Sequence, residues 1–120
     1  MDIDIFTKSS SQPESPYKVN FIIEDGILSI YCSCPAGTYG QLCKHKTSFI
    51  EGDYNMLHDI SQQQLLNDIV ATINASLFKN EYSRFKNRKL EIEKIQRKLK
   101  KELKDIKNDL AMKLQNGIKI

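Results

Sequence analysis

Residues 32–45 read CSCPAGTYGQLCKH and contain every cysteine of the 120-residue chain. The stretch offers four metal-binding side chains in the pattern C-x-C-x8-C-x-H, namely Cys32, Cys34, Cys43 and His45. Three thiolates and one imidazole are a complete tetrahedral ligand set for a structural zinc ion, whereas a catalytic zinc keeps one position open for water. The stretch therefore predicts one closed, structural Zn²⁺ site per chain.

The residues around the ligands suggest how they converge. On an extended strand alternate side chains point to the same side, so Cys32 and Cys34 present both sulfur atoms to one face. The proline and two glycines that follow interrupt regular structure and let the chain turn back. We expect Cys43 and His45 at the start of a short helical turn, where exposed backbone amides favour a thiolate.

Other uses of these cysteines explain the pattern less well. A disulfide network leaves one cysteine unpaired, and Cys32 and Cys34 are poorly placed to bridge each other. A nucleophilic Cys/His pair uses only two of the residues and has no orienting carboxylate close in sequence. The chain also has no glycine-rich phosphate loop, nucleophile elbow or paired acids. We therefore expect that the protein is not an enzyme.

The motif resembles the SWIM zinc fingers, whose ligands follow the pattern C-x-C, a variable gap, then C-x-H. The likeness extends to Pro35, Ala36 and Gly37 and to the strand-like YKVNFIIEDGILSIY before the first cysteine, and covers roughly residues 5–52. It implies a small sheet-plus-helix zinc module that binds DNA or other proteins and has no chemistry of its own. Gly52 follows His45 closely, so the helix after the last ligand should be short.

A β-hairpin leads into the zinc ligands. Two alternating apolar runs flank an Asp25-Gly26 turn, which is a strong hairpin signal. Residues 2–8 alternate acidic and apolar and predict an edge strand, and residues 9–16 have the composition of a loop. We assign residues 1–52 to a SWIM-like zinc-binding module and 53–60 to a connector. The predicted strand faces are Tyr17, Val19, Phe21 and Ile23, then Leu28, Ile30, Cys32 and Cys34.

Residues 61–120 are predicted to be helical. Ser61 and Gln64 fit a capping box, and apolar residues at helical spacing predict an amphipathic helix over about 61–79. A stretch without glycine or proline then predicts a long basic helix over about 81–116, ending at Asn116-Gly117. The expected fold class is thus α+β: a small antiparallel sheet with a zinc site, followed by a helical hairpin or a long coiled-coil-like helix.

The long helix carries a narrow apolar stripe. The intervals between its apolar residues are 3, 4, 4, 3, 4 and 4, an eleven-residue repeat. Such a stripe is poorly buried on a single helix and needs a partner, either the 61–79 helix or a second chain. We expect a homodimer formed through the helical region. The residues are Ile92, Ile95, Leu99, Leu103, Ile106, Leu110 and Leu114.

Charge divides the chain into two parts. Residues 1–78 carry four Lys/Arg and nine Asp/Glu, while residues 79–120 carry fourteen and six, so balances of −5 and +8 give the net +3. The basic run indicates either a phosphate-facing surface or the solvated face of a coiled coil. Few aromatic residues accompany it, so base-specific reading is not expected. The candidate contacts are Lys44, Lys46, Arg84, Lys86, Arg88, Lys89, Lys94, Arg97, Lys98 and Lys101.

These patterns favour a non-enzymatic zinc protein that binds nucleic acid, DNA above RNA, through the zinc module and basic helices. The alternative is a protein–protein adaptor or inhibitor whose helices bind a partner protein. A third hypothesis is an accessory subunit of a larger nucleic-acid enzyme. No transmembrane run or secretory signal is recognisable, and clustered cysteines fit a reducing compartment. We expect a cytoplasmic protein with no membrane partner.

Overall fold

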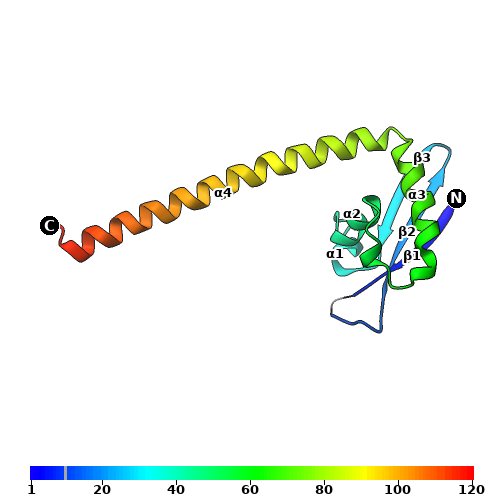
Figure 1. Cartoon of the computed structure of the whole chain (residues 1–120), viewed down its shortest axis with the longest axis horizontal. Helices are drawn as coiled ribbons and strands as arrows, with labels where there is room; N and C mark the ends of the chain where they lie inside the picture. The colour runs from blue at the N-terminus through cyan, green and yellow to red at the C-terminus, as the bar shows by residue number, and fades with distance from the viewer. Residues whose placement is uncertain (10) are drawn as a thin grey trace. The chain divides into compact units, whose positions relative to one another are not determined.

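The computed structural model describes residues 1–9 and 11–120; Ser10, within the predicted 9–16 loop, lies outside the described residues. The chain divides into two compact units, Met1–Leu77 and Phe78–Ile120, which are described separately. A three-stranded antiparallel sheet with short helices makes up the first unit, and one long helix dominates the second (Figure 1). The predicted α+β fold class is confirmed, and the helices that follow the zinc module include one long helix. The elements of the first unit are β1 (Asp2–Thr7), β2 (Tyr17–Glu24), β3 (Ile27–Cys32), α1 (Pro35–Thr38), α2 (Lys44–Ile50), η1 (Tyr54–Met56), η2 (Ile60–Gln62) and α3 (Gln63–Asn74).

The sheet has the order β1-β2-β3, so β2 is the central strand. Asp25 and Gly26 connect β2 to β3 with φ angles of 51° and 75°, the two left-handed residues that a two-residue type I′ turn requires. This turn sets the register, in which Phe21 faces Ile30 and Val19 faces Cys32. Because the side-chain period is two, the turn chemistry decides on which face Cys32 lies.

The core of the first unit lies between the sheet and helices α2 and α3. In Figure 1 these helices lie beside the sheet, and α2 contacts both β3 and α3. Phe21 and Phe49 are the largest fully buried side chains, one from the central strand and one from α2. Burying such a side chain contributes about 1.5–3 kcal/mol, which is substantial for so small a unit. The apolar core residues besides the three cysteines are Ile5, Val19, Phe21, Phe49, Ile50, Leu57, Leu66, Ile69 and Ile73.

The outer edge of β1 is covered by the segment that precedes α3. Thr7 forms a bridge with Leu57. The side chain of Gln62 accepts a hydrogen bond from the Phe6 amide at 2.9 Å and donates to the Asp4 carbonyl at 3.0 Å. These contacts occupy backbone groups that an edge strand otherwise offers to other chains.

The helices begin and end near, but not at, the expected positions. The expected 61–79 helix is α3, Gln63–Asn74, because Asp59 accepts hydrogen bonds from the amide and hydroxyl of Ser61 and starts the 3-10 turn η2 instead. The long helix is α4, Phe78–Asn116, and it ends at Gly117, whose φ is 91°. No helix in the described part of the chain is long and apolar enough to cross a membrane.

Candidate metal centre

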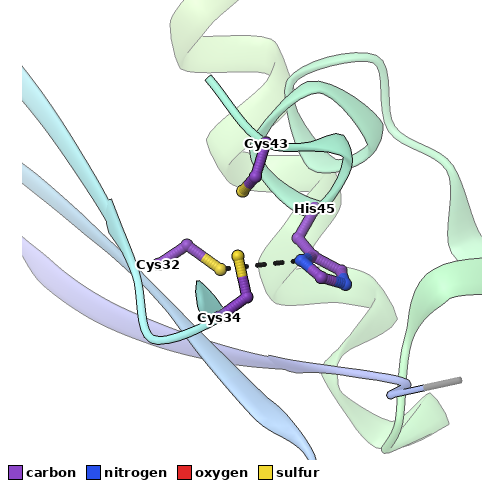
Figure 2. A group of neighbouring side chains, drawn as sticks. All are labelled: Cys32, Cys34, Cys43 and His45. Carbon is purple, nitrogen blue, oxygen red and sulfur yellow. Dashed lines mark hydrogen bonds between the residues drawn. The ribbon is translucent and has the colours of Figure 1, made fainter. Parts of the chain in front are cut away.

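The four predicted ligands come from the ends of three neighbouring elements (Figure 2). Cys32 is the last residue of β3, and Cys34 is the N-cap of α1. Cys43 is the N-cap of α2, and His45 lies in the first turn of that helix. The short helical turn expected at the second ligand pair is therefore present, and its seven residues fit the early stop expected from Gly52.

The ligand atoms are at distances that suit one zinc ion. All four lie within 4.8 Å of one another, and Cys32 Sγ lies 3.8 Å from Nδ1 of His45. With Zn–S bonds of about 2.3 Å and Zn–N bonds of about 2.0–2.1 Å, the edges of a tetrahedral site measure about 3.5–3.8 Å. Figure 2 shows the three sulfur atoms and Nδ1 pointing toward a common centre. The four atoms are therefore close enough together to serve as the ligands of one zinc ion.

Burial makes these ligands depend on a cation. All four side chains are buried, and the three cysteines are free thiols. Burial raises the pKa of the Cys32 thiol to about 12, and the neighbouring Cys34 and Cys43 sulfurs oppose its ionisation further. A divalent ion supplies the positive charge that three closely spaced thiolates need.

The pKa values of two other ligands are shifted toward their metal-binding protonation states. Burial disfavours the Cys34 thiolate, but the Gly37 amide, donating to Sγ at 3.2 Å, and the neighbouring thiols outweigh it, so the pKa of Cys34 lies below its ordinary value. Burial and then the charge of Lys44 lower the pKa of His45. The neutral imidazole, the form that binds metal, is thereby favoured.

The imidazole is held in place by an aromatic neighbour. The ring of Tyr17 lies 5.2 Å from that of His45, centre to centre, with the planes tilted by 52°. Within the described residues, Nε2 of His45 is a buried nitrogen with no hydrogen-bond partner, so packing rather than a second hydrogen bond orients the ring. In the sequence, strand alternation puts Tyr17 and Val19 on the same face. Val19 pairs with Cys32, so this alternation was the signal that Tyr17 lies near the metal site.

Gly37 makes the tightest approach in the site. A Cβ atom at this position would lie 2.4 Å from the Cys32 carbonyl oxygen and 2.7 Å from the Cys32 Cβ. The next residue, Thr38, donates its hydroxyl to the Cys34 carbonyl at 2.8 Å. The third position of α1 therefore requires glycine for space, although its φ is not left-handed.

Comparison with known protein families agrees with this geometry. Residues 17–46 match the family model described as SWIM zinc finger. This stretch is a SWIM zinc finger. The matched region contains β2, β3 and all four ligands, and the prediction of a single structural zinc ion is confirmed by the buried Cys3His group. Searches of curated proteins and of solved structures found no match to the chain.

The other candidate residues fall into two groups. On the SWIM finger, Lys44 is exposed, but Lys46 is buried and its Nζ donates to the Gln41 carbonyl at 3.1 Å. Lys46 thus stabilises the loop before Cys43, whereas Lys44 presents its charge to solvent. The basic candidates of the second unit are all exposed on α4, and they are Arg84, Lys86, Arg88, Lys89, Lys94, Arg97, Lys98 and Lys101.

Proposed function

We propose that this protein is a non-enzymatic, cytoplasmic zinc protein that binds nucleic acid, with DNA as the favoured ligand. The SWIM finger is the recognition head, and α4 supplies attraction for the phosphate backbone. The observation that carries the proposal is a group of exposed basic residues on one side of α4, here called the basic face. It consists of Lys94, Arg97, Lys98, Lys101 and Lys104.

Helical geometry gathers the basic face and separates it from the apolar stripe. Successive residues are about 100° apart around an α-helix, so residues three or four positions apart are neighbours. Glu102 follows Lys98 by four positions and Asp105 follows Lys101 by four, so both acidic residues are neighbours of the basic face. The apolar stripe, which contains Leu99 and Leu103, runs along another side of the helix. The basic face therefore lies away from the apolar stripe and keeps a net positive charge, although these neighbouring carboxylates reduce its attraction for phosphate.

The chemistry of this face suits backbone binding rather than sequence reading. Lysine predominates, and its ammonium is a point charge that attracts phosphate without the bidentate geometry used to read guanine. Each neutralised phosphate releases counterions, so such binding weakens steeply as salt rises. Exposed Lys44 adds a positive group beside the zinc ligand His45. Any preference for particular DNA must therefore come from the finger.

A second candidate function rests on the apolar stripe of α4. Ile92 and Leu99 are 41% and 57% exposed. A continuous row of exposed apolar side chains is typical of a surface that binds another protein. An adaptor or inhibitor would bury this stripe against a helix of a partner protein. Such an interface is held by apolar contact and tolerates salt, so salt dependence separates the two functions.

The test is DNA binding by the zinc-loaded full chain, measured by fluorescence anisotropy over a range of salt concentrations. Replacing Lys94, Lys98 and Lys101 by Gln should weaken binding and reduce the slope of log K against log salt by about 2.7, at about 0.9 per phosphate contact. The matched control replaces exposed Lys8, Lys18 and Lys79 by Gln, which changes the net charge equally away from the basic face. Equal binding by both variants would refute the basic face as the DNA contact.

A further inference from the structure

Because α4 begins at Phe78, its sequence pattern can be followed over a longer stretch than residues 92–114, and over that stretch a seven-residue repeat emerges. Two series of residues, each with seven-residue intervals, run from the first turn of α4 to Leu110. Each member of the second series comes four residues after one member of the first series and three residues before the next. In heptad terms they occupy positions d and a, the seam of a left-handed coiled coil. The d residues are Phe78, Phe85, Ile92, Leu99 and Ile106, and the a residues are Tyr82, Lys89, Gln96, Leu103 and Leu110.

This seam is open along the helix. Leu103 is 53% and Ile106 67% exposed, and a shallow hollow in the earlier heptads is lined by seam residues, among them Phe85 and Ile92. A coiled coil places one side chain of the partner helix into each such space. The seam therefore has the pattern and the access that a second helix of the same kind requires.

Charges beside the seam identify the partner and its direction. In a parallel, in-register pair, position g of one helix faces position e of the next heptad on the other. Three such pairs of charged residues arise, each of opposite sign and each occurring twice by symmetry, and no g–e pair is like-charged. They are Glu81 with Lys86, Arg88 with Glu93, and Glu102 with Lys107.

The antiparallel arrangement lacks this complementarity. It brings e positions of the two helices together, and four of the five e positions are lysine. Every overlapping antiparallel alignment therefore opposes lysine to lysine at least once. Like charges at these positions are a recognised device against wrong pairings. The e residues are Lys79, Lys86, Glu93, Lys100 and Lys107.

Two polar seam residues add to the choice of register. Lys89 and Gln96 occupy consecutive a positions, and a polar residue at a fixes register and chain number at some loss of stability. In the parallel in-register pair, Gln96 meets Gln96 of the second copy, where the two amides can bond to each other. Lys89 likewise meets Lys89 of the second copy, and this like-charged layer is a cost in stability of that register. In a shifted register the Gln96 amide would meet an apolar layer or Lys89.

We propose that α4 pairs with α4 of a second copy of this chain as a parallel, in-register, two-stranded coiled coil. The two SWIM fingers then emerge from the same end of the coiled coil. The basic face stays outside, because its residues occupy positions b, c and f. The pairing stands independently of DNA binding, since it uses the seam and its flanks rather than the basic face.

Sedimentation equilibrium of the zinc-loaded full chain tests the pairing. We expect a dimer, and a monomer at micromolar concentration or a trimer or tetramer would overturn the proposal. Glu102→Lys replaces two attractive contacts with repulsive ones and should weaken dimerisation about tenfold. Because α4 is exposed throughout this region, the variant leaves the zinc finger intact, and zinc content verifies this.

A second, compensating substitution tests whether the two α4 helices run parallel. Lys107→Glu added to Glu102→Lys restores opposite charges only between parallel chains, because residues five apart do not face each other within one helix. Recovery of the natural dimer affinity in the double variant supports the parallel register. A double variant as weak as Glu102→Lys alone, or a single variant as tight as the natural chain, refutes it.

Discussion

Replacing Gly37 with alanine tests the origin of the zinc site's geometry most directly. The added Cβ would lie 2.7 Å from the Cys32 Cβ, about 1 Å inside a favourable carbon–carbon contact. Its other near neighbour is a backbone oxygen, which cannot rotate away. The strand end that carries Cys32 or the turn that carries Cys34 must therefore move, and the tetrahedral ligand arrangement is disturbed.

The magnitude follows from two opposing effects. Overpacking of this kind costs typically about 1–3 kcal/mol, and a backbone neighbour places Gly37→Ala near the upper value. Alanine is more favourable than glycine within a helix by about 1 kcal/mol, and position 37 lies in α1. The net loss should be about 2 kcal/mol, or about a thirtyfold rise in the zinc Kd.

Competition with a chromophoric zinc chelator measures this change, and far-UV circular dichroism follows the melting temperature alongside it. Gly40→Asn is the control, because Gly40 has open space around its Cβ position and a φ of 75° that asparagine tolerates. We expect the control to lose less than about 1 kcal/mol. If Gly37→Ala has the zinc affinity and the melting temperature of the natural chain, the close approach of residue 37 to Cys32 is not required for the zinc site.

Three further outcomes follow from the metal centre and the core. Cys43→Ser should abolish stoichiometric zinc and unfold the Met1–Leu77 unit while α4 keeps its helical signal, since zinc binding contributes about 10–16 kcal/mol in zinc fingers; a variant with normal zinc content and melting temperature would remove Cys43 from the site. Zinc affinity should fall on acidification because protons compete for the thiolates. The low pKa of His45 means that its imidazole joins this competition only below its ordinary value of 6.5, and a chelator titration against pH that shows an earlier imidazole step would contradict this. Phe49→Ala should lower the unfolding free energy of the zinc-loaded unit by about 3–5 kcal/mol, whereas Tyr39→Ala, at an exposed position, should change it by less than about 0.5 kcal/mol in the same chemical denaturation assay.

The sequence was most informative where local chemistry decides the structure. The alternating hairpin, the Asp25-Gly26 turn and the ligand spacing all depend on contacts between residues close in the chain, and they predicted the sheet and the zinc cluster. The break between α3 and α4 was not predictable in the same way. It falls at residues 75–77, where alanine, serine and leucine carry no strong helix-breaking signal.

Long-range contacts account for most of what the sequence did not reveal. The side chain of Gln62 bonds to a strand more than fifty residues earlier, and no periodicity marks a glutamine for that role. Lys46 is a local case that the sequence also did not reveal: its partner, the Gln41 carbonyl, is five residues away, and the two come within hydrogen-bonding distance only once the loop before Cys43 has folded. The eleven-residue spacing was read from the last part of α4 alone, and the start at Phe78 was needed to see the heptads.

The covered outer edge of β1 determines how long a segment must be to fold when it is moved into another protein. Residues 17–46 carry the family motif, yet β1 and the segment that caps it with Gln62 lie on either side of that stretch. Excising the motif alone would uncover one side of β2 and remove Leu66 and Ile69 from the core. Anyone grafting this finger onto another protein should therefore move residues 1–77 together, because its evolutionary signature is shorter than its folding unit.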